Sequence, residues 1–394
     1  MVNPCGDAAA PHATARSFTT EAGFHVRIHE SLDTVDALAW DALAGTGAVV
    51  RSFGYLRAIA AAGVNDCRYF YPVVSDAAGR LLAHCCVYVI TTDLLQILPA
   101  ALQPWARAVR RVWPGFLRVR ITECASPHVV GQSFSFAPDA PREPLLTALD
   151  RAISTIAEAM HSPLIVVRDF RDDELADFGA LVPLGYLRVA NMPMSRIAIR
   201  WESHAAYLAA MKSRYRKDLG RRLRRAAAAG REVRRLDTFA ERAEVCSEQV
   251  QLAYARSQGV RREILGAAYY REIDQHLGAH SHLLAAEENG HMVGHGLLLT
   301  DDTHVVATWS GRDAGPPGDV WFSLLDAAVR FAIERRAAWL NLGLGTYAAK
   351  SLLGAEPVAL SCFVRSRYRL ANRAMALIPD FMARHPPDVH HVFR

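Results

Sequence analysis

The strongest chemical pattern in the sequence is a loop rich in glycine and proline, at residues 309–320. Its centre reads Arg312-Asp-Ala-Gly315-Pro-Pro-Gly318-Asp, between an alternating, strand-like segment and an amphipathic helix pattern. The N–H groups at a helix N-terminus lack intrahelical partners and lie at the positive end of the helix dipole, so they bind anions. Glycine lets the backbone approach such a ligand closely. The loop therefore predicts a phosphate cradle, although an ordinary strand-to-helix turn uses the same residues.

Two features of this loop reduce its capacity for an anion. Pro316 and Pro317 remove two backbone donors. Asp319 is a good helix cap, and its carboxylate competes with an anion for the remaining N–H groups. We therefore expect fewer backbone contacts to a phosphate here than a loop without these residues would offer.

Composition limits the kind of protein that carries this loop. The 394 residues are 51% hydrophobic and 22% charged, with a formal net charge of +5, which is typical of a globular enzyme of about two domains. The seven cysteines are scattered and form no C-x-x-C pair, which favours a reduced, cytoplasmic setting, and no metal-ligand spacing is present. The most apolar stretch is interrupted by polar residues, so we expect no membrane span.

The order of predicted elements is similar in the two halves of the chain. After a leader at 1–22, the first half predicts a strand at 24–30, helices at 34–43 and 52–63, a hairpin at 68–93, a helix at 143–160 and a strand at 163–170. The second half predicts helices at 204–230 and 241–257, a meander at 282–311, a helix at 320–337 and a strand at 339–345. We expect an internal duplication, with domains at 23–198 and 199–394.

This order, together with the glycine loop, the stretch "MKSRYRKDLGRRLRRAAAAG" and the segment "LNLGLGTYAAKSLLGAEPV", resembles the GNAT N-acetyltransferase fold. The pairing of two halves resembles the Fem-type and CelD-like acyltransferases. The resemblance implies an α/β (α+β) fold of two tandem GNAT-like domains, each a mixed, mostly antiparallel sheet flanked by helices. It also implies acyl transfer to an amine, with acetyl-CoA or a longer acyl-CoA as co-substrate.

In GNAT enzymes the pyrophosphate-binding pattern is Gln/Arg-x-x-Gly-x-Gly/Ala, between the fourth strand and the next helix. This chain has one residue more between the two glycines of the pattern. The resemblance implies that the donor is bound by seven residues: Trp309, Gly311, Arg312, Gly315, Gly318, Asp319 and Val320.

The resemblance also supplies candidate catalytic residues. Single-domain GNATs often have a tyrosine acid four residues before the glycine of the final turn, and that position before Gly354 is Lys350 here. Tyr347 lies one helical turn earlier, so either side chain could assist the leaving thiolate. His295 or Asp313 could act as the general base. The alternatives are a solvated helix lysine and a hydrogen-bonded strand histidine.

The first half lacks these motifs. Leu181 occupies the position that corresponds to Lys350, and no glycine loop precedes the helix pattern at 143–160. We expect the first half to shape a substrate cleft without catalysing transfer itself.

A basic segment opens the second half. Residues 212–235 contain eleven Lys or Arg and two acids. Such a run suits a phosphate or nucleic-acid partner, but it is also typical of a solvated face. Fem-type enzymes use aminoacyl-tRNA, so the resemblance makes tRNA an alternative partner. It also adds phosphate or substrate contacts, which are Arg214, Arg216, Tyr254 and Arg256.

Three functions remain open from the sequence. The first is a cytoplasmic N-acyltransferase that uses acyl-CoA and a small-molecule or peptide-like amine acceptor. The second is an aminoacyl transferase of the Fem type that uses aminoacyl-tRNA. The third is a non-catalytic adaptor that binds an anionic partner through the basic helix.

Overall fold

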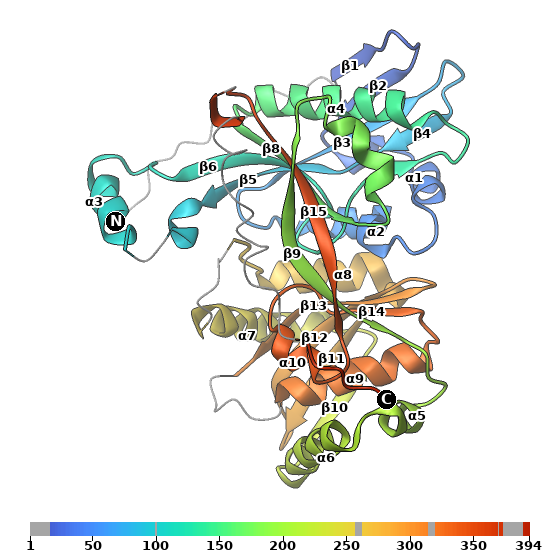
Figure 1. The fold of residues 1–394 in the computed structure, drawn as a ribbon, viewed down its shortest axis with the longest axis vertical. Coiled ribbons are helices and arrows are strands. Elements are labelled where there is room, and N and C mark those ends of the chain that lie inside the picture. The colour runs from blue at the N-terminus through green and yellow to red at the C-terminus, as the bar shows by residue number, and fades with distance from the viewer. Residues whose placement is uncertain (1–15, 99–100, 257–261, 314–319, 369, 373–388) are drawn as a thin grey trace.

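A computed structural model describes residues 16–98, 101–256, 262–313, 320–368, 370–372 and 389–394. Within these residues, 15 strands form one continuous mixed sheet, and helices cover its faces (Figure 1). The predicted α/β class, with a mixed and mostly antiparallel sheet flanked by helices, is confirmed.

The first half, up to residue 198, contains nine strands and four α-helices among the described residues. The strands are β1 (Arg16–Thr19), β2 (His25–His29), β3 (Arg68–Ser75), β4 (Leu81–His84), β5 (Val87–Asp93), β6 (Arg118–Cys124), β7 (Ser135–Phe136), β8 (Leu164–Arg171) and β9 (Leu187–Ala198). The helices are α1 (Ala37–Ala44), α2 (Phe53–Ala62), α3 (Gln103–Val112) and α4 (Arg142–Ala159).

The second half contains six strands and six α-helices among the described residues. The strands are β10 (Arg231–Leu236), β11 (Ser281–Glu288), β12 (His291–Thr300), β13 (His304–Arg312), β14 (Trp339–Asn341) and β15 (Glu356–Ser366). The helices are α5 (His204–Ala210), α6 (Ser213–Ala228), α7 (Ala243–Arg256), α8 (Ala267–Leu277), α9 (Val320–Glu334) and α10 (Tyr347–Ser351).

The two halves exchange their last strands. The sheet order is β1-β2-β3-β5-β6-β8-β15-β9-β14-β13-β12-β11-β10. Thus β15, from the end of the chain, pairs with β8 and β9, while the end of β9 pairs with β14. Both strands run vertically between the two lobes in Figure 1. Each half has one parallel pair, β6 with β8 and β13 with β14, and these two pairs flank the exchanged strands.

A shared core also joins the halves. Helix α2 begins at Ser52, whose Oγ accepts from the Tyr55 backbone N–H, and it ends at Gly63, which has φ +58°. Its buried face packs against α8, placing residues such as Ile59 and Ile273 in one hydrophobic cluster. One sheet and one core therefore extend across the boundary at 198/199. The division into domains at 23–198 and 199–394 stays a proposal.

Strand β11 explains why the meander reads as a nearly continuous apolar run. Leu283 and Ala285 face the shared core, whereas Leu284 and Ala286 face the core under α9. Since helices cover both faces of this part of the sheet, the usual alternation with polar residues is lost.

The prediction of one long helix at 204–230 was wrong. The helical conformation is interrupted between α5 and α6 at Met211. The extended backbone of Met211 forms a β-bridge with Phe393, near the end of the chain. The Arg216 guanidinium contacts the carbonyl oxygens of Leu208, Ala209 and Met211 at the end of α5. The break therefore depends on contacts that helical periodicity does not contain.

Candidate functional site

The parallel strands β13 and β14 separate after a short paired region. Only His304 to Val306 pair with Trp339 to Asn341, after which β13 continues to Arg312. Beyond this point β13 carries a bulge, because Gly296 and Leu298 of β12 face Ser310 and Ala307. Thr308 and Trp309 therefore oppose the single residue Leu297. A bulge of this kind disrupts the ladder and redirects the side chains and N–H groups beside it.

A narrow cavity of about 40 Å³ lies at this separation. Trp309 and Ser310 from β13, Leu342 after β14, Trp321 from α9 and Lys350 from α10 contribute to its wall. The indole Nε1 of Trp321 is buried and has no hydrogen-bond partner among the described residues. The cavity thus offers polar groups in an otherwise apolar wall, which is the usual character of a ligand site.

Lys350 is the buried cation of this cavity. Its side chain is almost fully buried, and Nζ donates to the Leu344 carbonyl at 2.8 Å and lies 3.4 Å from the Gly343 carbonyl oxygen. Desolvation lowers the pKa of Lys350 to about 7. An amine with this pKa can supply either a positive charge or a proton near neutral pH.

Tyr347 does not join Lys350 in the cavity wall. Its hydroxyl donates to the Pro193 carbonyl at 2.8 Å, and burial raises its pKa. The two residues share a helix, but Lys350 bonds to the segment after β14 and Tyr347 bonds to β9, so the structure brings only Lys350 to the site.

Beyond the bulge, the Trp309 indole lies in a polar cluster between the halves. Its indole Nε1 donates to the His128 carbonyl at 3.0 Å, and the Tyr254 ring packs edge-on at 6.0 Å. Tyr254 was predicted from the sequence, and its hydroxyl is buried without a partner among the described residues. The structure therefore brings Trp309 and Tyr254 together.

Glu263 is the carboxylate of this cluster. Its Oε1 lies 4.0 Å from His128 Nδ1 and 3.9 Å from Arg262 Nε, and its side chain is 15% exposed. Desolvation raises the pKa of Glu263. His128 is buried, its Nε2 lies 2.8 Å from the Tyr69 hydroxyl, and burial lowers its pKa to about 3, so the ring is neutral. A carboxylate that retains protons easily, beside a neutral imidazole, is suited to proton transfer.

The corresponding separation in the first half is filled by the protein's own charges. After β6 and β8 diverge, Arg168 bonds to Glu123 at 3.0 Å and to Tyr88 at 2.6 Å, while Arg262 also contacts Glu123. The two arginines hold the pKa of buried Glu123 at about 2 despite desolvation. Because ion pairs occupy this space, it offers less room to a donor than the separation at β13 and β14.

The expected phosphate loop lies only partly within the described residues. Gly315, Gly318 and Asp319 fall outside them. Arg312 ends β13, and its pKa is lowered first by burial and then by the nearby positive charge of Arg256 at the end of α7. Two guanidinium groups that raise each other's electrostatic energy form a favourable position for an anion.

Other sequence candidates lie inside the core. His295 is fully buried, with Nε2 2.9 Å from the Tyr270 hydroxyl and Nδ1 2.8 Å from Gln249 Oε1. Gln249 also donates to Asp313 at 2.9 Å. Burial lowers the pKa of His295 to about 3. Since both ring nitrogens are engaged, His295 has no nitrogen available for a substrate proton, and Asp313 belongs to the same network.

Gly311 and Val320 pack elements together. A Cβ on Gly311 would lie 2.6 Å from the Gln249 carbonyl carbon, so glycine allows α7 to approach β13. Val320 is buried at the start of α9, and a Cβ on Gly294 would meet it at 2.6 Å.

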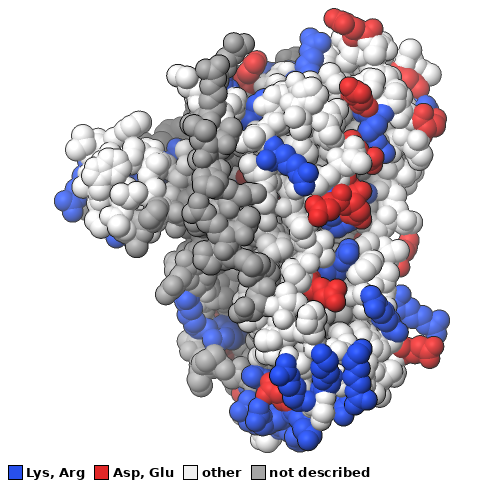
Figure 2. All heavy atoms as spheres, viewed as in Figure 1, with Lys and Arg blue, Asp and Glu red and all other residues white. Residues whose placement is uncertain are grey.

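The basic segment forms α6 at the lower end of the molecule, where Figure 2 shows a group of blue side chains. Arg214 is exposed and stacks on Tyr215 at 4.4 Å, whereas Arg216 caps α5 as described above. The exposed cations of α6 are Arg214, Lys217, Arg221, Arg224 and Arg225. The structure does not bring this surface into the wall of the Lys350 cavity.

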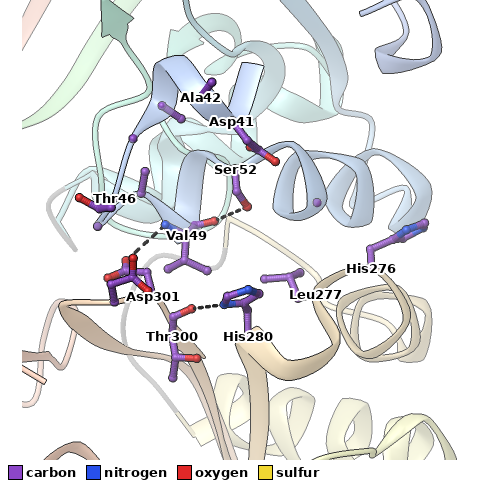
Figure 3. Close-up of a pocket in the computed structure, with 16 residues that line it drawn as sticks. Asp41, Ala42, Thr46, Val49, Ser52, His276, Leu277, His280, Thr300 and Asp301 are labelled. Carbon is purple, nitrogen blue, oxygen red and sulfur yellow. Dashed lines mark hydrogen bonds between the residues drawn. The ribbon is translucent and has the colours of Figure 1, made fainter. Parts of the chain in front are cut away.

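A second cavity, of about 520 Å³, lies between the halves (Figure 3). Asp301 accepts from the Val49 N–H at 3.3 Å across it, and His280 contacts the Thr300 carbonyl at 3.1 Å. It begins at the start of β13, five residues or roughly 16 Å along the strand from Trp309. No residue selected from the sequence lines it.

The described residues hold neither a metal site nor a membrane-spanning helix. No group of His, Cys, Asp and Glu there has the arrangement of a metal site. Nor does any helix in those segments have the length and apolarity needed to cross a membrane.

Comparison with known proteins agrees with this architecture. A crystal structure of FemX superposes with a TM-score of 0.55 at 13% identity, covering 86% of this chain and 98% of that one. The C-terminal domain of a lysylphosphatidylglycerol synthetase from Agrobacterium fabrum gives 0.51 at 11% identity, covering 83% and 92%. These two likenesses show that the chain has the fold of FemX and of that synthetase domain.

Residues 31–316 match the FemAB-like family model, described as peptidoglycan biosynthesis/recognition, and the chain belongs to this family. A Mycobacterium tuberculosis protein named 8-amino-7-oxononanoate synthase 2 is 23% identical over 349 residues, which is 84% of this chain. The match covers 45% of that relative, so the chain spans about half its length. The predicted resemblance to Fem-type and GNAT proteins is confirmed.

Sequence reasoning missed Glu263 and His128. Both lie in irregular segments, where no helical or strand periodicity indicates the direction of a side chain. The segment "RREI" at 261–264 offered a local signal for Glu263, because it places a carboxylate beside two arginines between two helix patterns.

Proposed function

We propose that this chain transfers an acyl group from acyl-CoA to an amine acceptor, with the donor thioester between β13 and β14. One observation carries this proposal: a buried lysine with a pKa of about 7 lines the cavity where β13 bulges away from β14. Arg256 and Arg312 would bind the pyrophosphate of CoA, together with the loop that follows Arg312.

The reaction requires three proton transfers and the exchange of a C–S bond for a C–N bond. Glu263 takes a proton from the acceptor ammonium, and the free amine attacks the thioester carbonyl carbon. Backbone N–H groups at the bulge near Trp309 stabilise the oxyanion. As the C–S bond breaks, Lys350 gives a proton to the thiolate. The nitrogen gives its second proton to the Lys350 amine once that amine has protonated the sulfur, so Lys350 is charged again and the proton on Glu263 is the one released overall.

The acceptor side of this mechanism rests on the polar cluster beside Trp309. Glu263 supplies negative charge, and Tyr254 and Trp309 supply aromatic surface, a combination that attracts an ammonium group. We therefore propose a small-molecule or peptide-like amine as acceptor. Residues 23–198 would shape this side and 199–394 would bind the donor.

Aminoacyl-tRNA is the second candidate donor. Membership of the FemAB-like family and the exposed cations of α6 favour it. Phosphate contacts from such a surface make binding fall steeply as salt rises. The amide-forming chemistry would be the same, with an ester in place of the thioester. An adaptor that binds an anionic partner through α6 would use neither Lys350 nor Glu263.

The cysteines within the described residues are free thiols. They support our proposal of a cytoplasmic location, where thiols stay reduced.

Donor-dependent product release separates these candidates. Acetyl-CoA and amine acceptors should release free CoA thiol, detected with a chromogenic disulfide, and Lys350→Met should slow the release about 100-fold. Deacylation of aminoacyl-tRNA without thiol release from any acyl-CoA would establish the second candidate. An enzyme inactive with both donors would contradict both.

A further inference from the structure

We infer that the lobe around α3, residues 101–117, binds the surface of a membrane that contains anionic lipid. This lobe projects from the side of the molecule in Figure 1 and is separate from the Lys350 cavity. The proposal is independent of the acyl donor.

The lobe exposes large apolar side chains that nothing in the described structure covers. Trp105 is 60% exposed, Val112 is 90% exposed and Trp113 is 63% exposed. Trp105 and Val112 are seven residues apart in α3 and therefore share one face. Isolated exposed apolar residues are common, but two tryptophans and a valine on one projection form a binding surface.

Positive charge borders this apolar face. Residues 94–122 contain five arginines and no acid. Arg107 and Arg111 are exposed and lie four residues apart, so they share a face of α3 on the opposite side from Trp105 and Val112. In Figure 2 the lobe is white with blue at its edge. A helix with tryptophan on one side and arginine on the other is typical of an element that lies in a membrane interface.

The lobe is held in a defined shape. Arg110 makes two bonds to Asp93, of 2.5 and 2.8 Å, and its Nε donates to the Phe116 carbonyl. The rings of Trp105 and Trp113 each lie 5.6 Å from Phe116. Arg110 is used internally, whereas Arg107, which donates to Gln103 Oε1 at 3.0 Å, and Arg111 are exposed and can reach lipid phosphates. The tryptophans are presented without an ordering cost.

Charge identifies an anionic membrane as the occupant. A second copy of the chain would bring Arg107 and Arg111 against the same two cations, and an RNA would leave the tryptophan and valine face exposed to water. An anionic interface accommodates both features, since aromatic rings prefer the headgroup region and arginines bind lipid phosphates.

Vesicle binding by the purified full chain tests this inference. Wild type should sediment with vesicles of phosphatidylcholine and phosphatidylglycerol far more than with phosphatidylcholine alone. Arg107→Ala with Arg111→Ala should weaken binding about 20-fold, since each cation near such a surface contributes about fivefold. Val112→Glu changes a side chain that is 90% exposed, and it should also weaken vesicle binding. Lys217→Ala with Arg224→Ala removes equal charge from α6 and should leave binding unchanged.

Brominated lipid gives a second readout. It should quench tryptophan fluorescence in wild type, and Trp105→Phe with Trp113→Phe should lose most of that quenching. Absence of wild-type binding to the mixed vesicles, or equal loss in the α6 control, would overturn the inference. So would self-association through the lobe in sedimentation velocity, or binding of RNA that the α3 variants abolish.

Discussion

Lys350 couples the chemistry of the site to the stability of the protein. Burial lowers its pKa from 10.5 to about 7. Between these values the unfolded chain binds more protons than the folded chain, so stability rises with pH across the window from about 7 to 10.5. Below pH 7 the folded protein carries a buried charge. A residue that is costly to bury and lines a cavity is more readily explained by function than by packing.

We predict that Lys350→Met lowers kcat by about 100-fold, the usual effect of removing one stabilising charge at a reacting centre. The wild-type kcat should fall as pH rises through about 7, because the proton on Lys350 is lost, and the variant should lack this decline. At pH 6 the variant should have a higher Tm than wild type. A variant with normal kcat, or with a lower Tm and no change in its pH profile, would contradict the assignment.

Glu263 should control the opposite limb of the pH profile. Its pKa is raised by burial, and a base acts when deprotonated, so kcat/KM should increase with pH through that pKa. Glu263→Gln should lower kcat/KM by about 100-fold or more and remove this limb. Glu272→Gln on α8, whose carboxylate contacts His276, is the matched control. Equal effects of the two substitutions would mean that Glu263 has only a structural role.

At the scale of elements, the approach of α7 to β13 positions Tyr254 and Arg256 beside Trp309 and Arg312. Gly311 makes this approach possible. We predict that Gly311→Ala lowers the free energy of unfolding by about 1–3 kcal/mol, the usual cost of overpacking. Gly296→Ala on the neighbouring strand is the control, because no atom lies within 4 Å of its added Cβ. Chemical denaturation measures both, and equal stability would contradict the packing argument.

Periodicity predicted most elements, because burial of one face leaves a repeating pattern. The meander at 282–311, the helix at 320–337 and the strand at 339–345 correspond to β11 to β13, α9 and β14. The break at Met211 and the α3 lobe were not predicted, since the first depends on Phe393 and the second buries little apolar surface. Among site residues, Lys350 could be selected by its spacing from Gly354. Glu263 could not, because only the folded chain brings it to Trp309.

At the scale of the molecule, the exchange of β9 and β15 makes the halves interdependent. Without β15, the edge of β8 is unpaired, and without β9 the same is true of β14. We predict that residues 23–198 and 199–394, expressed separately, fail to unfold cooperatively in denaturant, whereas co-expressed halves form a complex that does. Cooperative unfolding of either half alone would contradict this view.

The central claim is that acyl-CoA binds with its sulfur between Trp309 and Lys350. A crystal structure with bound CoA tests it most directly. We predict the pyrophosphate near Arg256 and Arg312 and the thiol at the mouth of the cavity beside the β13 bulge. CoA bound elsewhere, for example in the cavity beside Asp301, or crystals that bind no CoA at saturating concentration, would contradict it.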